Sequence, residues 1–474
     1  MDKLDALLRA DSAEVRGAFR DLVADLTPGR ADEVIPALAD ALPTAPPQRR
    51  PHLVVALGLL ADTEDPAVLE ALTKRLDGPL EMVADAQRPL LTALLYLLGH
   101  FPAQRERVLD AFRGADISPD EASRLDRSLD ALDPAAPVIG RVWPSPLAWS
   151  LTPEQAAKDA EWARSLPTDV VTAAWREDTG TLHAYAGAKA LWDAESGLTP
   201  DGEEPEVVPP SAPSAPADAG PARWTRFAEA FRCPACLSAL TEADGGASCT
   251  GCGTLYSETD GLLQFGSDST GPSEAMFQAA FTRYERRLRP PVLRLSGSNW
   301  DNVLTPADED AFLAANVSPV DGPVLDVGCG PGRWTAVLAR EFGSERVIAL
   351  DRSPTMLGLV RHSMPDVVRV GSDALNLPFA DASVGAVNSW NMLQALPDPA
   401  KAVAEMGRVL RPGGTFTLMT YRTSDDPVYA HFQKQLTLTT FDPAELEGWL
   451  AGAGLTVRQR TTPGTFLLLT AVRD

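Results

Sequence analysis

A glycine-rich turn directly after a short apolar run constrains the fold of the C-terminal part of the chain more than any other feature. The stretch GPVLDVGCGPGRWTAVLAREFG (322–343) predicts a strand, a tight turn and a helix, and ERVIALDRS (345–353) predicts a second strand that ends on Asp351. The alternating glycines let the backbone approach a flat or charged ligand closely. A carboxylate at the end of the second strand can accept hydrogen bonds from both hydroxyls of a ribose. The pattern therefore predicts an α/β domain that binds a nucleoside.

Two common phosphate-binding turns do not fit this stretch. A dinucleotide site shows G-x-G-x-x-G, whose last glycine opens a helix N-terminus toward a pyrophosphate. Here the spacing is G-x-G-x-G, and Arg333 stands where that last glycine would be. A Walker loop is excluded as well, because no Gly-Lys-Ser/Thr follows. We therefore expect a nucleoside ligand without a pyrophosphate.

From about residue 320 to the C-terminus, the sequence resembles the class I S-adenosylmethionine-dependent methyltransferases. The resemblance is carried in order by VLDVGCGPG, VIALDRSPTML, GSDALNLPFADASVGAVNSWNMLQALPDP, RVLRPGG and the closing segment FLLLTAVRD. It implies a Rossmann-like α/β domain at 320–474, with a seven-stranded and mostly parallel sheet. It also implies that S-adenosylmethionine is the cofactor and methyl transfer the reaction.

The resemblance also implies which residues contact the cofactor. The glycines approach its methionine part, Asp351 binds the ribose, Asp373 binds the adenine amino group, and Met356 or Ala374 covers an adenine face. For Asp373 the residues leave a second interpretation open, since SDALNLPF is also a good loop in which an aspartate caps a turn. The full predicted set is Asp326, Gly328, Gly330, Gly332, Asp351, Arg352, Met356, Asp373, Ala374 and Asn388.

Catalysis of methyl transfer needs few protein groups, and a general base is required only where the acceptor must lose a proton early. The predicted catalytic residues are His431, Tyr284 and Asn388, with Tyr421 and Tyr429 as further candidates for the base. His431 fits an exposed helix histidine without a catalytic role better, because no partner for it is visible in the sequence. The expected end of the fourth strand reads NSWNML rather than Asn/Asp-Pro-Pro-Tyr/Phe, which argues against methylation of exocyclic amines of nucleobases.

Four of the five cysteines of the chain follow the spacing C-x2-C-x12-C-x2-C, at Cys233, Cys236, Cys249 and Cys252. Each C-x2-C turn directs two thiolates to one point, and two such turns complete a tetrahedral site that suits Zn²⁺. Disulfides are the alternative, and a cytosolic chain makes them rare. We expect a zinc ribbon at 223–268 whose metal is structural, followed by acceptor-side cap helices at 269–319. A zinc ribbon ahead of this fold also resembles the bacterial 23S ribosomal RNA guanine-N1 methyltransferases.

The N-terminal part is predicted to be helical. The segments VIPAL, VLEAL and VLDAF begin at residues 34, 68 and 108, and their spacing fits a HEAT-like helical array over 1–199. An unrelated helical bundle is the alternative. Five tryptophans at 140–200 fit either core packing or a ligand-stacking groove. The Pro-, Ala- and acid-rich residues 200–222 predict an extended linker that leaves the array free to move relative to the other domains.

Charge and hydropathy limit the partners. The formal net charge is −23, and residues 1–220 hold 37 acidic against 20 basic side chains. Such a surface disfavours nucleic acid, whose binding depends on Lys and Arg. The most hydrophobic segment, at 90–98, is too short to span a bilayer, and the N-terminus lacks the layout of a secretory signal. We therefore expect a cytoplasmic protein without a membrane partner.

Three functions remain open at this point. The first is methyl transfer to a small-molecule or peptide acceptor in specialised metabolism, with a protein partner for the helical array. The second is an rRNA guanine-N1-type methyltransferase, which the ribbon favours and the acidic charge disfavours. The third is a non-catalytic scaffold that binds S-adenosylmethionine, against which the intact glycine turn, Asp351 and Asp373 speak.

Overall fold

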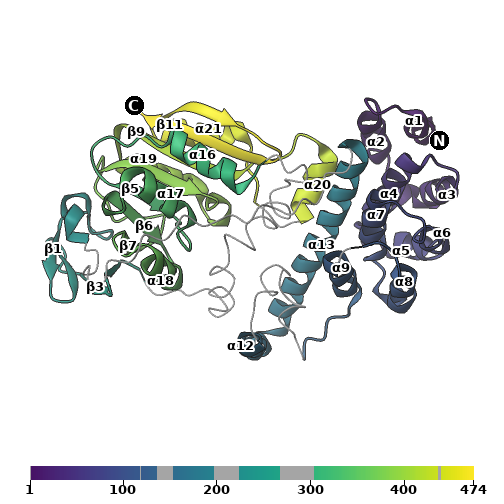
Figure 1. Cartoon of the computed structure of the whole chain (residues 1–474), viewed down its shortest axis with the longest axis horizontal. Coiled ribbons are helices and arrows are strands. Elements are labelled where there is room, and N and C mark those ends of the chain that lie inside the picture. Colours follow the sequence, from purple (N-terminus) through teal and green to yellow (C-terminus); the bar gives the residue numbers. More distant parts are fainter. Residues whose placement is uncertain (1, 118, 136–152, 197–223, 267–303, 436–438) are drawn as a thin grey trace.

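The computed structural model describes residues 2–117, 119–135, 153–196, 224–266, 304–435 and 439–474 (Figure 1). Along the chain these form an all-α region, a small β module and an α/β domain. The predicted linker and most of the predicted cap segment, Tyr284 included, lie outside the described residues.

The N-terminal region is all-α, as the sequence predicts. Several of its helices begin with a proline in the first turn, where the missing N–H costs nothing. The helices are α1 (Asp2–Arg9), α2 (Val15–Val23), α3 (Ala31–Ala41), α4 (Arg50–Ala61), α5 (Pro66–Thr73), α6 (Asp77–Glu81), α7 (Arg88–Leu98), α8 (Arg105–Phe112), α9 (Pro119–Leu129), α12 (Pro153–Ser165) and α13 (Thr168–Ser196).

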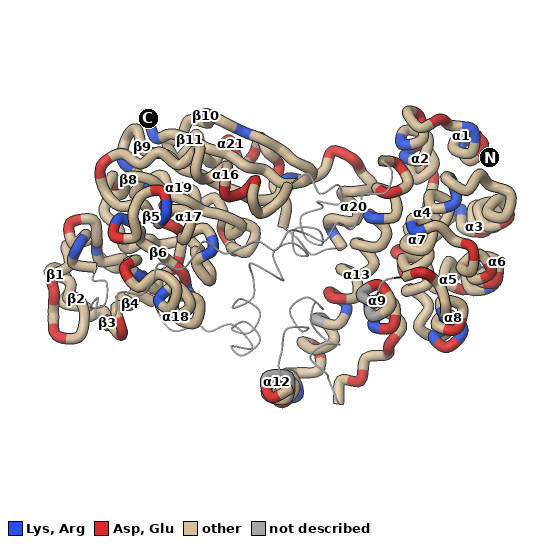
Figure 2. The backbone as a smooth tube through the Cα atoms, in the orientation of Figure 1, with Lys and Arg blue, Asp and Glu red and all other residues tan. Residues whose placement is uncertain are grey.

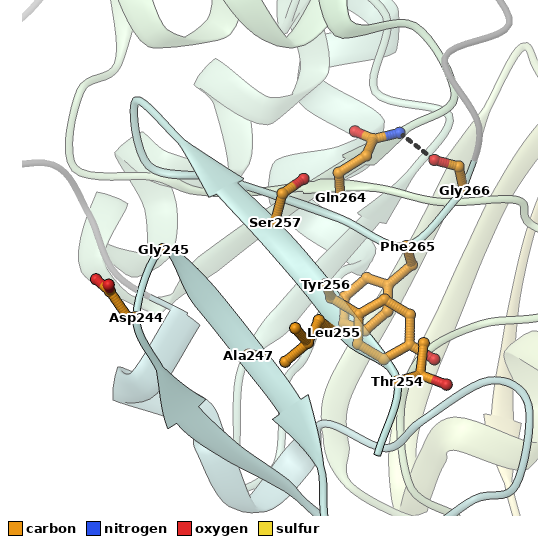
Figure 3. A pocket seen from close by; sticks show the side chains of 10 residues that line it. All are labelled: Asp244, Gly245, Ala247, Thr254, Leu255, Tyr256, Ser257, Gln264, Phe265 and Gly266. Carbon is orange, nitrogen blue, oxygen red and sulfur yellow. Dashed lines mark hydrogen bonds between the residues drawn. The ribbon is translucent and has the colours of Figure 1, made fainter. Parts of the chain in front are cut away.

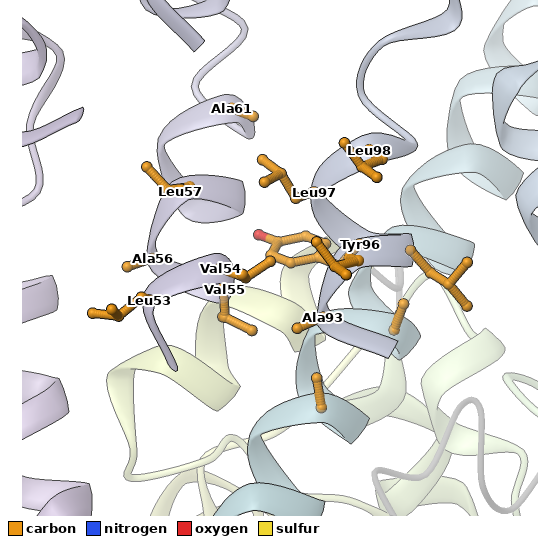
Figure 4. Close-up of a cluster of buried hydrophobic side chains, with 14 of the residues drawn as sticks. Leu53, Val54, Val55, Ala56, Leu57, Ala61, Ala93, Tyr96, Leu97 and Leu98 are labelled. Atoms are coloured by element: carbon orange, nitrogen blue, oxygen red, sulfur yellow. The ribbon is translucent and has the colours of Figure 1, made fainter. Parts of the chain in front are cut away.

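The core of this region lies between α4 and α7, whose sequences are apolar on nearly every face because other helices surround them (Figure 4). Tyr96 of α7 is fully buried there, and its ring lies where Gly58 of α4 leaves room for it. The three repeated sequence segments lie in α3, α5 and α8. The helical fold is thereby confirmed, whereas HEAT-like repetition stays a prediction.

Two of the five tryptophans have described surroundings, and both rings contact neighbouring side chains of the chain. The guanidinium of Arg127 lies 3.5 Å from the ring centre of Trp175, and the ring of Trp192 lies 6.4 Å from that of Tyr429. These contacts fit the interpretation of core packing. For the other three tryptophans, the side chains lie outside the described residues.

The α/β domain contains the mostly parallel sheet that the sequence predicts. In the order β7-β6-β5-β8-β9 neighbouring strands are parallel, and β11 and β10 complete the edge in antiparallel pairing. Its elements are α16 (Pro306–Asn316), β5 (Val324–Val327), α17 (Arg333–Phe342), β6 (Val347–Asp351), α18 (Pro354–Ser363), β7 (Val368–Gly371), β8 (Val384–Trp390), α19 (Pro399–Val409), β9 (Leu410–Tyr421), α20 (Pro427–Gln435), α21 (Pro443–Gly452), β10 (Leu455–Thr461) and β11 (Phe466–Arg473).

Helices cover both faces of this sheet. Apolar side chains of α16, α17 and α18 share one buried cluster, and those of α19 and α21 share the other. The strands between them are buried on both faces, which explains why β5 and β8 read as nearly continuous apolar runs. Such doubly wound sheets bind ligands at the carboxyl ends of their parallel strands.

The β module is part of the same sheet. It contains the short 3₁₀ segment η4 (Trp224–Ala230), β1 (Leu240–Ala243), β2 (Gly246–Cys249), β3 (Leu255–Thr259) and β4 (Leu262–Gln264). Strand β4 pairs in parallel with β7, so the module extends the sheet to eleven strands. The module and the α/β domain, which we expected to be separate units, are joined by this strand pairing.

Helix α20 connects the α/β domain to the helical region. It follows the carboxyl end of β9, yet its buried apolar side chains belong to the core of the N-terminal helices (Figure 1). Phe432 is fully buried against Tyr96 and lies where Gly187 of α13 leaves space. The helical region is therefore fixed on α20, and the expectation that it moves freely on a linker was wrong.

Candidate cofactor and metal sites

The glycine turn between β5 and α17 requires its three glycines. Gly328, Gly330 and Gly332 have φ angles of 71°, 52° and 92°, in the left-handed region that side chains other than glycine rarely adopt. A Cβ atom on Gly328 would lie 2.3 Å from Cγ of Met392. Among the described residues, a Cβ atom on Gly330 would meet no atom within 4 Å. The turn is thus packed on one side and open to a ligand at Gly330.

Asp351 ends β6 directly beside this turn, as predicted. Its Oδ2 accepts the backbone N–H of Gly330 at 2.9 Å, and its Oδ1 accepts that of Ser353 at 2.9 Å. Burial raises the pKa of this carboxyl above its usual range. Each carboxylate oxygen can accept a second hydrogen bond. The geometry therefore fits a carboxylate that is held in place by the backbone and still able to accept ribose hydroxyls.

Asp326 lies beneath the turn and is almost fully buried. Its Oδ2 accepts the hydroxyl of Thr335 at 2.5 Å, and its Oδ1 accepts Nδ2 of Asn388 at 2.7 Å. Burial raises the pKa of Asp326 to about 6. These bonds tie β5 to α17 and β8, so Asp326 holds the turn in place through protein contacts.

Asn388 lies within β8, two positions before Trp390 ends the strand, and its side chain is buried against Asp326. The sequence analysis expected it at the strand end, where the reacting methyl would be. The residue that follows the strand is Asn391, whose φ of 58° is rare for a side chain other than glycine. Its Oδ1 accepts the hydroxyl of Tyr421 at 2.8 Å and Nε2 of Gln394 at 2.9 Å.

This network at the carboxyl ends of β8 and β9 was missed by the sequence analysis. The available signal was an asparagine directly after a predicted strand, since asparagine tolerates the left-handed region better than most residues. Tyr421, a candidate for the general base, is buried, and its hydroxyl donates a hydrogen bond to Oδ1 of Asn391. In this arrangement it orients the amide of Asn391.

The other predicted cofactor residues surround the same edge of the sheet. Oδ1 of Asp373 accepts the N–H of Leu375 at 2.9 Å, so this residue does cap its turn, as the second interpretation expected. Met356 and Ala374 are buried apolar residues, and Arg352 is exposed beside Asp351. Contact of these residues with a cofactor stays a prediction.

His431 lies on α20 and contacts the helical region. Its Nε2 donates to Oδ2 of Asp62 at 2.7 Å, and the same carboxylate also accepts from His100 and Tyr96. This partner is structural, and the geometry lends no support to the predicted catalytic role. Tyr429 of the same helix is buried beside Arg20. Burial raises the pKa of the Tyr429 hydroxyl above its usual value.

The four cysteines of the β module come together as predicted. Their sulfur atoms all lie within 4.8 Å of one another, with Cys233 and Cys252 at 3.7 Å and Cys236 and Cys249 at 3.3 Å. A tetrahedron with Zn–S bonds of about 2.3 Å places its sulfurs about 3.8 Å apart. The donor set therefore fits a closed, structural zinc site.

A hollow of about 540 Å³ lies on the β module (Figure 3). Tyr256, Gln264 and Phe265 line it, and so does Gly266, the last described residue before 267–303.

Comparison with known proteins identifies the α/β domain. Residues 325–418, from β5 to β9, match a family model described as a methyltransferase domain. The C-terminal part of the chain is a class I S-adenosylmethionine-dependent methyltransferase domain. The match contains the glycine turn, Asp351 and Asp373, and it ends before α20.

Individual relatives agree with this methyltransferase domain. An uncharacterised chloroplastic methyltransferase of Arabidopsis thaliana is 31% identical over 193 residues, which make up 37% of this chain and 54% of the relative. Trans-aconitate 2-methyltransferase of an Azoarcus species is 35% identical over 135 residues, covering 27% of this chain and 53% of the relative. The chain thus spans about half the length of these two relatives.

Among solved structures, geranyl diphosphate C-methyltransferase from Streptomyces coelicolor is similar, at 17% identity and a TM-score of 0.31, over 35% of this chain and 76% of the other.

No helix in the described part of the chain is long and apolar enough to cross a membrane.

Proposed function

We propose that this protein transfers the methyl group of S-adenosylmethionine to a small-molecule or peptide acceptor. The observation that carries the proposal is the contact between Asp351 and the backbone of Gly330. It places a half-buried carboxylate beside an open glycine turn, which suits the ribose and the methionine part of one nucleoside cofactor. Oδ1 of Asn388 adds a buried acceptor without a partner among the described residues.

The chemistry asks mainly for alignment. A bound S-adenosylmethionine supplies an electrophilic methyl group, and the protein has to place an acceptor in line with it. Positioning of this kind can contribute about 7–11 kcal/mol. We propose that the Asn391 network supplies part of this positioning, because it lies at the carboxyl ends of β8 and β9. An early proton transfer is required only if the acceptor is a weak nucleophile such as a hydroxyl.

Charge supports a small-molecule or peptide acceptor over RNA. Acidic and basic side chains are interspersed along the backbone of both parts of the molecule, and the acidic ones dominate by 23 charges overall (Figure 2). An RNA acceptor would need an excess of Lys and Arg to offset its phosphates. The name of the Azoarcus relative, a methyltransferase for trans-aconitate, is in line with a small acceptor. We also propose that the protein acts in specialised metabolism and that its helical region binds a partner protein.

The experiment is transfer of a labelled methyl group from S-adenosylmethionine by the full chain. Three acceptor pools are offered separately: a small-molecule extract, a peptide and protein extract, and ribosomal RNA. Label in either of the first two pools is the expected result. Label in ribosomal RNA would overturn the acceptor assignment and favour the guanine-N1-type alternative. Cofactor binding without label in any pool would favour a non-catalytic scaffold.

A further inference from the structure

We propose that the four-cysteine module is a structural part of the cofactor site, and that metal binding at the cysteines maintains the loop 372–380, which carries Asp373 and Ala374. The inference rests on the proposed function, because it takes this loop to be the adenine side of an S-adenosylmethionine site. It gives the metal an effect on cofactor affinity.

The first connection is the strand pairing at the edge of the sheet. Leu263 and Gln264 of β4 pair with Val370 and Gly371 of β7, and the N–H of Phe265 donates to the carbonyl of Gly371 at 2.7 Å. Gly371 is the last residue of β7 and leads directly into the loop. The module therefore fixes the strand from which the loop departs.

The second connection consists of hydrogen bonds between the module and the loop itself. The N–H of Arg232 donates to the carbonyl of Pro378 at 3.0 Å, and the N–H of Ala380 donates to the carbonyl of Ala230 at 2.8 Å. Nδ2 of Asn376 donates to the carbonyl of Pro234 at 3.3 Å. Pro234 directly follows Cys233 within the first C-x2-C turn, so this bond reaches the metal site itself.

The third connection is a chain of aromatic rings between the cysteines and the loop. The hydroxyl of Tyr256 lies 3.0 Å from Sγ of Cys233, and its ring packs on Phe265 at 4.7 Å between centres (Figure 3). Phe265 stacks on Phe231, and Phe231 packs on Phe379 of the loop at 4.8 Å. Cys233, Phe231 and Phe379 are fully buried in one core that also contains residues of the methyltransferase sheet.

Metal binding affects the loop because the module is too small to fold on its own hydrophobic core. A unit of this size usually depends on metal for folding. When the cysteines lose the metal, the loop loses the backbone bonds at Pro378 and Ala380 and the cover of Phe379. One lost hydrogen bond of about 1.4 kcal/mol corresponds to about tenfold in affinity. We therefore expect metal loss to weaken cofactor binding about tenfold or more.

The test is calorimetric titration of the full chain with S-adenosylhomocysteine, together with elemental analysis for zinc. Cys236→Ser removes an exposed ligand and should lower both zinc content and affinity. Asn376→Ala keeps the four cysteines and removes only the bond to Pro234, so zinc should stay and affinity should fall about threefold, less than for loss of a full hydrogen bond. Leu255→Ser changes a side chain of the module that is 73% exposed, and it should change neither quantity.

Hydrogen exchange of the zinc-loaded and the chelated wild-type protein distinguishes a local effect from global unfolding. The amides of Asn376 and Ala380 should exchange faster after chelation, while those of β8 stay protected. Unchanged affinity in Cys236→Ser protein that lacks zinc would overturn the inference and leave the ribbon a separate unit. If the zinc-loaded wild type binds no S-adenosylhomocysteine, the proposed function itself fails.

Discussion

His431 and Asp62 are 369 positions apart in the sequence and 2.7 Å apart in the structure. The contact joins the helix that follows the carboxyl end of β9 to the core of the N-terminal helices. A second contact between the same parts is the ion pair of Arg20 with Asp426 at 2.7 Å, in which both side chains are mostly buried. The helical region therefore fixes the position of α20, the helix that follows the carboxyl end of β9 in the methyltransferase domain.

Substitution of Phe432 by alanine tests this docking. The side chain is fully buried between α13 and Tyr96, and a buried phenylalanine truncated to alanine costs about 3–5 kcal/mol. We expect a loss of that size in the free energy of unfolding of the helical region, measured by denaturant titration. Lys434→Ala, an exposed position on the same helix, is the control. A loss below 1 kcal/mol for Phe432→Ala would contradict the docking.

The docking also changes what a truncation can show. Residues 221–474 contain all of the predicted cofactor residues. In the structure, removal of the helical region would expose Val428, Tyr429 and Phe432, which are buried in its core. Single substitutions in the full chain are therefore the cleaner experiment.

Two buried histidines should each contribute less stability as the pH drops below neutral. Burial lowers the pKa of both His52 and His183 to about 3, so the unfolded chain binds protons at these sites more readily than the folded one. Their contribution is complete above the unfolded pKa of about 6.5 and declines toward pH 3, by up to about 1.4 kcal/mol per pH unit and site. His183→Gln should flatten the dependence of the unfolding free energy between pH 6.5 and 4, whereas His362→Gln, at an exposed site, should not. Equal slopes in both variants would contradict the assignment.

Asp62 adds a separate loss at lower pH. Its burial favours the neutral acid, but hydrogen bonds from His100 and His431 outweigh burial and hold its pKa below the usual range. A lowered carboxyl pKa contributes stability above the unfolded value of about 3.9, and this stability is lost as the pH falls below it. Asp62→Asn should therefore reduce the stability at pH 7 and remove a part of the acid-induced loss below pH 4.

Two glycines of the turn should respond differently to alanine. Both substitutions place a side chain at positive φ, which costs about 1–2 kcal/mol. At Gly328 the new Cβ would also clash with Met392, so we expect a larger loss of stability. At Gly330 the Cβ would contact no described residue, so we expect a folded protein with weakened cofactor binding. Thermal unfolding and titration with S-adenosylhomocysteine measure the two effects, and full affinity in Gly330→Ala would place the ligand elsewhere.

The parts that the sequence predicted are those with local patterns. The glycine turn and Asp351 lie next to each other because strand, turn and strand are consecutive, and the four cysteines meet because two identical turns direct them to one point. Partners far apart in the sequence leave no such pattern. Nothing in β4 alone identifies β7 as its neighbour, and nothing in α20 shows that Phe432 packs into another region. The sequence could not show which of Asn388 and Asn391 lies at the end of β8, because the end of a predicted strand is uncertain by a few residues.

The most direct measurement is calorimetric titration of S-adenosylhomocysteine into wild type, Asp351→Ala and Asp321→Ala. Asp321 is a matched control, since it is 97% exposed and precedes β5 at the opposite end of the strands. We predict one site per chain in the wild type and in Asp321→Ala. Asp351→Ala should weaken binding by about 1.5–3 kcal/mol, about tenfold to a hundredfold. Equal affinity in all three proteins would contradict the cofactor site described above.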